Sequence, residues 1–115
     1  MARITLRAEP RRVIVAFEAD VIADTTDAVC LDEAGYPPAF YLPSDAITPD
    51  RLVASDRTSR CPFKGEADYF HWRTAEGALI ENAFWRYAAP LDAVAAIAGR
   101  LAPDRSKLTV RVAEA

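Results

Sequence analysis

The sequence is poor in cysteine, histidine and glycine, and each shortage excludes a class of site. Its 115 residues include two cysteines, one histidine and four glycines. Cys30 and Cys61 form no Cys-x-x-Cys pair, and with His71 they provide too few ligands for a zinc site built from Cys and His alone. Four isolated glycines provide neither a phosphate-binding P-loop nor a dinucleotide fingerprint. We therefore expect no structural metal and no nucleotide site of those two kinds.

Strong charge and long hydrophobic runs are also lacking. Lys and Arg number 14 against 17 Asp and Glu, and a net charge of -3 does not favour nucleic-acid binding by bulk charge. No apolar run approaches membrane-spanning length, and Arg3 and Arg7 interrupt the place where a signal peptide needs apolar residues. We expect a soluble, cytoplasmic protein with reduced thiols and a single domain over residues 1–115, whose 51% apolar residues suffice for one core.

Short β-branched and alternating segments predict a mostly β fold with antiparallel connections. Residues 12–17 and 21–25 have the pattern of a hairpin, and Pro37 and Pro38 leave room only for a short edge strand after them. Ser44 and Asp45 resemble the N-cap of a single turn. After Pro90, apolar residues follow a 3.6-residue period, which predicts one C-terminal helix over residues 90–102. Strands are predicted at residues 12–17, 21–25, 28–33, 39–42, 51–55, 67–74, 78–87 and 107–112.

The clearest hairpin joins residues 67–74 to residues 78–87. Glu76 and Gly77 lie between them, and glycine provides the positive φ that a two-residue turn needs. Such a turn places Tyr69 opposite Phe84, because facing residues are then fixed by their distance from the turn. Each face of this predicted hairpin carries both aromatic and polar side chains, so neither is a plain solvent face.

Two side chains of this hairpin are candidates for acid–base chemistry. The predicted register places Glu81 near Trp72 and Trp85, and a carboxylate among apolar groups must be paired, exposed at the sheet rim or raised in pKa. Glu81 is therefore either a structural ion-pair partner or a general base. His71, predicted to face Asn82, is either a hydrogen-bonded packing residue or a general base that Asn82 orients.

Residues 56–65 show no periodicity and predict a loop rich in hydrogen-bond donors. These donors suit an anionic or phosphorylated ligand, although a solvated loop in which Asp56 caps a turn explains the composition equally well. Cys61 is either a nucleophile, if nearby cations lower its pKa, or a small buried hydrophobic residue. The donors are Arg57, Thr58, Ser59, Arg60 and Lys64.

Two motifs in this region resemble a known family. Ser-Asp-x-Thr-x-x-Cys-Pro-x-Lys-Gly-x-Ala-x-Tyr begins at Ser55, and Glu-Asn-Ala-x-Trp-x-Tyr begins at Glu81. Together with GYPPAFYLP upstream and LDAVAAIAGRLAPDR downstream, they resemble the bacterial family called domain of unknown function 427. The resemblance implies a β-tent, two antiparallel sheets meeting at an angle, and brings a nucleotidyltransferase label. The Cys-x-x-Cys zinc motifs common in β-tent proteins and the acidic pair of polymerase-like enzymes are absent from this sequence.

These observations favour a domain that binds a small polar or anionic molecule in a cleft. A first alternative is a group-transfer or hydrolytic enzyme, in which Glu81 or His71 is the general base and Lys64 stabilises negative charge. A second is a protein-interaction module that uses exposed aromatic residues such as Phe40, Tyr41, Trp72 or Trp85. Ligand, cofactor and oligomeric state stay open. The predicted cleft residues are Asp56, Thr58, Cys61, Lys64, Tyr69, Glu81, Asn82 and Trp85.

Overall fold

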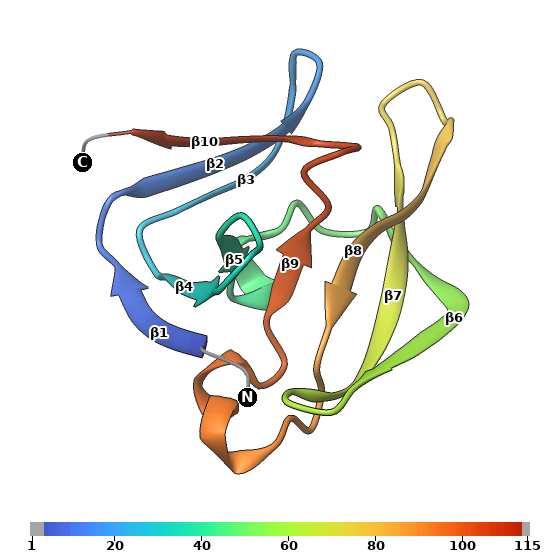
Figure 1. The fold of residues 1–115 in the computed structure, drawn as a ribbon. Coiled ribbons are helices and arrows are strands. Elements are labelled where there is room, and N and C mark those ends of the chain that lie inside the picture. Colours follow the sequence, from blue (N-terminus) through green and yellow to red (C-terminus); the bar gives the residue numbers. More distant parts are fainter. Residues whose placement is uncertain (1–3, 114–115) are drawn as a thin grey trace.

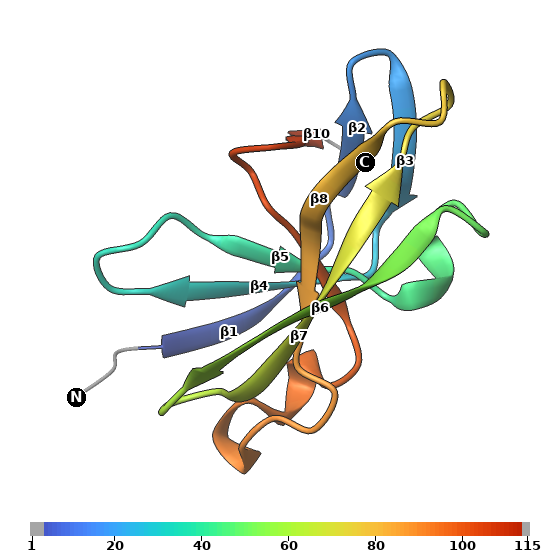
Figure 2. The same ribbon diagram turned by 90° about the vertical axis from the view of Figure 1, so that its right-hand side faces the viewer.

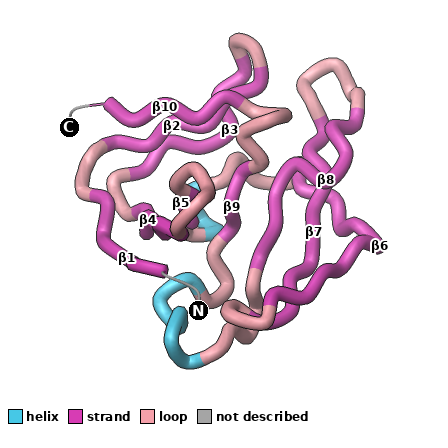
Figure 3. The backbone as a smooth tube through the Cα atoms, viewed as in Figure 1, coloured by secondary structure: helices cyan, strands magenta, loops and turns pink. Residues whose placement is uncertain are grey.

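The computed structural model describes residues 4–113, and nearly all of its regular structure is β (Figures 1 and 3). The mostly β prediction is therefore confirmed. The helical segments within residues 4–113 are two short 3-10 turns, η1 (Ser44–Ala46) and η2 (Asp92–Ile97). The strands are β1 (Ile4–Glu9), β2 (Arg12–Phe17), β3 (Asp20–Thr25), β4 (Ala28–Glu33), β5 (Ala39–Tyr41), β6 (Leu52–Cys61), β7 (Gly65–Arg73), β8 (Leu79–Arg86), β9 (Leu101–Pro103) and β10 (Thr109–Ala113).

The strands form three antiparallel sheets, so the predicted two-sheet arrangement is wrong. Sheet A has the order β1-β4-β5, sheet B the order β10-β2-β3, and sheet C the order β6-β7-β8-β9. The chain leaves sheet A for sheet B at Pro10, which has no N–H to continue a ladder. It returns to sheet A between β3 and β4, so four consecutive strands divide between two sheets. Paired backbone hydrogen bonds of 2.9 Å between Leu42 and Leu101 connect sheet A to sheet C.

Sheet C separates two hydrophobic clusters. Cluster 1 lies toward sheet B and contains Trp72 and Phe84 of sheet C. Cluster 2 lies toward sheet A and η2 and contains Tyr41 and Tyr87. Alternation along β7 explains the division, because Trp72 and Tyr69 point to opposite faces of the sheet.

No helix in residues 4–113 is long and apolar enough to cross a membrane.

The β7–β8 hairpin exists, but its predicted two-residue turn is wrong. Thr74 donates its N–H to Ala78 O at 2.8 Å, which leaves three residues, 75–77, in the loop, with Gly77 at φ +92°. This loop alone would place Tyr69 opposite Ala83, because facing residues would then be equally distant from the loop. Further along, residues 81–83 of β8 form a bulge against one residue of β7, and this second shift places Tyr69 opposite Trp85 rather than Phe84.

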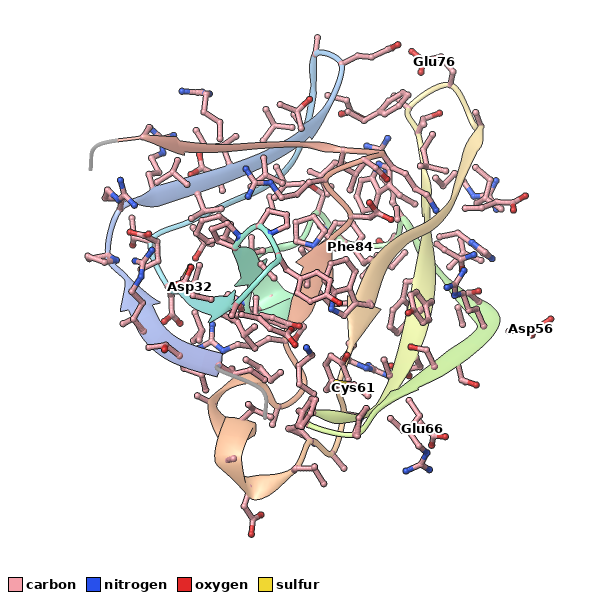
Figure 4. The ribbon with its side chains drawn as sticks, in the orientation of Figure 1. Asp32, Asp56, Cys61, Glu66, Glu76 and Phe84 are labelled. Carbon is pink, nitrogen blue, oxygen red and sulfur yellow. The ribbon has the colours of Figure 1, made fainter. Side chains whose placement is uncertain are left out.

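Most of the predicted loop over residues 56–65 is strand. β6 continues to Cys61, and its periodicity is hidden by a bulge in which residues 55–57 oppose Tyr69 alone. A turn follows, in which Lys64 donates its N–H to Cys61 O at 3.3 Å, and Gly65 has φ +112°. Asp56 lies in the bulge and projects outward from the molecule (Figure 4), so the interpretation as the cap of a turn is wrong.

The predicted C-terminal helix is also wrong. Only η2 forms, with six residues and a kink at Val94, and β9 follows it. A spacing of three between Val94 and Ile97, which are both buried, fits the three-residue turn of a 3-10 helix. The segment cannot lengthen, because Leu91 donates to Lys64 O at 2.9 Å and Gly99 donates to Tyr87 O at 3.0 Å. These bonds hold both of its ends close to sheet C.

Predictions for the N-terminal part of the chain agree better with the structure. The hairpin of β2 and β3 and the strand β4 form at the expected residues, and β5 is a short edge strand as the prolines before it predict. The turn η1 also forms, but Pro43 occupies its N-cap position without a side-chain hydrogen bond. The prediction that Ser44 or Asp45 caps this turn is therefore wrong.

Candidate functional site

A cavity of about 650 Å³ lies between sheets A and C. Figure 2 shows β4 and β5 of sheet A and β6 and β7 of sheet C diverging from the middle of the molecule. The β4–β5 loop and the β9–β10 loop supply the remaining walls. Its lining includes Leu31, Glu33, Tyr36, Ala39, Tyr41, Arg57, Cys61, Lys64, Tyr69, Asn82, Trp85, Tyr87, Asp104, Arg105, Ser106 and Lys107.

The predicted cleft residues divide into two groups. Five of them line this cavity, and the strands that carry them are β6, β7 and β8 with the β6–β7 turn. Asp56, Thr58 and Glu81 are exposed and are absent from the lining, as is His71. Alternation and the two bulges direct these side chains elsewhere. The residues brought together are Cys61, Lys64, Tyr69, Asn82 and Trp85.

The two bulges are joined across β7 by a hydrogen-bond network. Ser55 Oγ donates to Asn82 Oδ1 at 2.5 Å and accepts the Arg57 N–H at 3.1 Å. On the other side, Asn82 donates its backbone N–H to Nδ1 of His71 at 2.9 Å. The network places the Arg57 guanidinium 4.8 Å from the centre of the Tyr69 ring, a cation–π contact in the cavity wall. His71 is therefore a hydrogen-bonded residue that supports the bulge.

Aromatic residues form the inner wall. Trp85 donates its indole N–H to Tyr41 Oη at 3.0 Å, and the two rings meet edge to face. The Tyr87 ring centre lies 6.4 Å from that of Tyr41. Burial raises the pKa of Tyr41 to about 12, and burial also raises the pKa of Tyr87 well above its ordinary value. Both hydroxyl groups consequently stay protonated near neutral pH and are available as donors.

An ion pair crosses the cavity between the two sheets. Lys64 Nζ, in the β6–β7 turn, lies 2.8 Å from Glu33 Oε1 at the end of β4. The two side chains are only 11% and 19% exposed, so solvent screens this pair less than a surface pair. Of the other predicted loop donors, Arg57 also lines the cavity, whereas Arg60 pairs with Glu66 on the surface. Ser59 is outside the lining and shares a hydrogen bond with Tyr69 Oη.

Cationic residues exceed carboxylates in the lining. Arg57, Lys64, Arg105 and Lys107 face two acids, Glu33 and Asp104. Two of these cations also bridge the walls: Arg105 donates to Pro38 O at 3.1 Å, and Lys107 Nζ donates to Glu81 O at 2.8 Å. This excess gives the cavity a positive field although the chain as a whole is acidic.

Several lining residues were missed by sequence reasoning. Glu33 at the end of β4, Tyr41 in β5 and Tyr87 just after β8 are distant in the chain. The motifs of the family resemblance contain Tyr41 and Tyr87, but no local pattern predicts that the three residues converge. Tyr36 belongs to the GYPPAFYLP segment and Arg105 to the PDR end of the downstream segment, which contributed to the family resemblance. That resemblance was the available signal for these two loops.

The two cysteines have different environments. Cys30 is buried in cluster 1, where burial raises its thiol pKa. Cys61 is half-buried and lies in the cavity wall against cluster 2. Within residues 4–113, no three His, Cys, Asp or Glu side chains lie close enough together to hold a metal ion.

Fold and site together define a small β protein with a ligand-sized cavity between two of its sheets. The model of the family described as domain of unknown function (DUF427), labelled NTP_transf_9, matches residues 5–114. The chain therefore belongs to this family, and the resemblance seen in its motifs is confirmed. No curated protein matches the sequence.

Proposed function

We propose that this chain is a small-molecule-binding domain, and that its ligand is a small polar organic molecule held between sheets A and C. The observation that carries the proposal is the cavity itself. Its volume of about 650 Å³ lies within the usual range of ligand sites. Tyr36, Tyr41, Tyr69, Trp85 and Tyr87 supply large apolar surfaces, and a few charged groups among them suit a ligand that has both a ring and a polar group.

The alternative of an enzyme receives less support. Glu81 is exposed and outside the lining, and only its carbonyl oxygen bonds to a cavity residue, Lys107. His71 uses Nδ1 to accept the Asn82 N–H, which occupies the nitrogen lone pair on that side of the ring. Neither side chain is placed to act on a molecule in this cavity, whereas Lys64 is.

The aromatic residues named for the interaction-module alternative are not exposed in the structure. Phe40, Tyr41 and Trp72 are buried and Trp85 is half-buried, so their expected exposure is wrong. The exposed aromatic residues are Tyr36, at 70% exposure, and Phe63, at 43%. Tyr36 lies at the cavity, which makes it a wall of the proposed ligand site.

Chemical shifts measured by NMR test the proposal directly. We expect compounds drawn from neutral, anionic and cationic aromatic fragments to shift the indole N–H of Trp85, while the indole N–H of Trp72, in cluster 1, stays fixed. Tyr36→Ala is expected to weaken that binding, and Phe63→Ala, which removes an exposed ring outside the cavity, is the matched control. If fragments of every charge leave Trp85 unmoved, the cavity is not a ligand site.

A further inference from the structure

We infer that the ligand carries an oxyanion, a carboxylate or phosphate group, which binds Lys64 Nζ and the Tyr87 hydroxyl in exchange for Glu33. This inference rests on the proposed function, because it names the chemical class of the ligand in the same cavity. Three independent features of the lining support it: an unpartnered hydroxyl, an internal ion pair and the excess of cations.

The Tyr87 hydroxyl lacks a partner. The residue is only 6% exposed and lines the cavity, yet its hydroxyl makes no hydrogen bond within residues 4–113. Among the described residues, the fully buried side-chain polar atom without a partner is Trp72 Nε1. The unpaired Tyr87 oxygen does not fall in that class, so it is still reachable by solvent. Because polar groups of nearly buried residues are normally paired within the protein, this unpaired and reachable hydroxyl is available to bond a ligand atom.

The neighbouring Tyr41 hydroxyl adds a second donor. Its oxygen accepts the Trp85 indole N–H at 3.0 Å, but its own proton has no acceptor among the described side chains and backbone. Burial raises the pKa of both tyrosines, so neither is an anion that would repel the ligand. Two O–H groups on adjacent rings in one wall are suited to the several lone pairs of a carboxylate or phosphate.

The Glu33 carboxylate occupies the position on Lys64 that we infer for the oxyanion of the ligand. Its carboxylate lies 2.8 Å from Lys64 Nζ, which has three donor hydrogens and no other partner within the described part of the chain. The side chain is at the open end of β4, next to the turn in which Tyr36 donates its N–H to Glu33 O. An incoming oxyanion competes with Glu33 for Lys64, and Glu33 can rotate from this strand end toward solvent.

The charge of the remaining lining favours an anion over a cation. Asp104, the second carboxylate, accepts hydrogen bonds from the N–H and hydroxyl of Ser106 at 2.9 and 2.6 Å through Oδ1, and its Oδ2 lies 3.9 Å from Lys107 Nζ. A cationic ligand would therefore have to take Glu33 from Lys64 and face the other three cationic side chains. An oxyanion gains favourable interactions with the same groups, and the low exposure of Lys64 strengthens them.

Four small probes with the same benzene ring test the inference: benzoate, phenyl phosphate, the neutral benzamide and the cationic benzylamine, each titrated while the Trp85 indole resonance is followed. We expect at least one oxyanion to bind about tenfold tighter than benzamide, since hydrogen bonds to charged groups are the stronger kind. The ratio between benzoate and phenyl phosphate identifies which oxyanion is preferred. Benzylamine is expected to bind more weakly than benzamide.

Variants separate the roles of the three groups. Tyr87→Phe is expected to weaken the oxyanion about three- to tenfold and leave benzamide almost unchanged, because only one hydroxyl is lost. Lys64→Met is expected to weaken it further, whereas Glu33→Gln, which removes the competitor, is expected to tighten it. If Lys64→Met alone fails to fold, the Glu33→Gln/Lys64→Met double variant, which leaves no unpaired charge, replaces it.

Each possible result has a defined meaning. If benzamide or benzylamine binds as tightly as both oxyanions, the inference is wrong and the cavity is still a ligand site. Weaker oxyanion binding by Glu33→Gln overturns the exchange with Lys64, and unchanged binding by Tyr87→Phe overturns the role of that hydroxyl. If no probe of any charge shifts Trp85, the proposed function fails as well.

Discussion

Asn82 shows how one residue shapes the cavity wall. It has φ +50°, in the left-handed region that asparagine tolerates better than most residues. Its backbone N–H binds His71, its side chain accepts a hydrogen bond from Ser55, and the residue lines the cavity. Asn82 therefore contributes to both bulges of sheet C, to the β8 bulge through its backbone and to the β6 bulge through its side chain.

Two replacements of Asn82 isolate the contribution of its positive φ to stability. Asn82→Ala and Asn82→Gly both lose the bond to Ser55, but only alanine resists a positive φ. We expect Asn82→Ala to have a free energy of unfolding about 1 kcal/mol below that of Asn82→Gly. Urea denaturation followed by circular dichroism measures the difference. Equal stability of the two variants would show that the positive φ contributes nothing.

At the scale of elements, Glu9 determines the corner between β1 and β2. The residue is almost fully buried, and its carboxylate accepts hydrogen bonds from the Arg11 backbone N–H and guanidinium at 2.9–3.1 Å and from Arg7 at 3.1 Å. Hydrogen bonding to Arg11 is the main reason that the pKa of Glu9 is lowered to about 2. Figure 1 shows the chain turning from sheet A into sheet B at this point.

This lowered pKa predicts how stability depends on pH. Because the folded pKa of Glu9 lies below its ordinary value of 4.5, its contribution is complete above pH 4.5 and disappears as the pH falls toward 2. We expect Glu9→Gln to be less stable than the natural chain at pH 7, with the gap narrowing between pH 4.5 and 2. Urea unfolding of both proteins across this range gives the gap. A gap that stays constant down to pH 2 would contradict the assigned role.

At the scale of the whole molecule, sheet C belongs to both hydrophobic clusters. Trp72 packs in cluster 1 and Trp85 against cluster 2, and the two residues lie on neighbouring strands that pair directly. Sheet A also contributes to both sides, through Cys30 in cluster 1 and Leu31 in cluster 2. Neither cluster can lose its packing without disturbing strands that the other one needs.

We therefore expect the two clusters to unfold together. In Trp72→Phe the remaining tryptophan reports on cluster 2, and in Trp85→Phe it reports on cluster 1. Within each variant, the urea midpoint measured by tryptophan fluorescence should equal the midpoint measured by far-ultraviolet circular dichroism, as two-state unfolding requires. Separate midpoints in either variant would mean that one cluster unfolds independently.

Site residues could be predicted from the sequence where they lie close together in the chain, and could not be predicted where tertiary packing brings them together. Lys64, Tyr69 and Trp85 were recognisable because they lie in motifs of closely spaced polar and aromatic residues. Glu33 lies outside those motifs, and Tyr41 and Tyr87, although they belong to segments that resemble the family, were not assigned to the cleft. These three residues meet only when sheet A packs against sheet C. Glu81 and His71 were assigned to the site through a hairpin register that the three-residue loop and the β8 bulge change.

Local sequence signals were sufficient to predict the mostly β class, the strands β2, β3, β4 and β5, and the family, since β-branched runs, prolines and short motifs act over short distances in the chain. Tertiary structure alone decided the division into three sheets, the two bulges and the shortening of the predicted helix to η2. It also decided that Lys64 faces Glu33 across a cavity. The reason is physical: register and sheet packing depend on side chains from distant strands, whose meeting no local pattern contains.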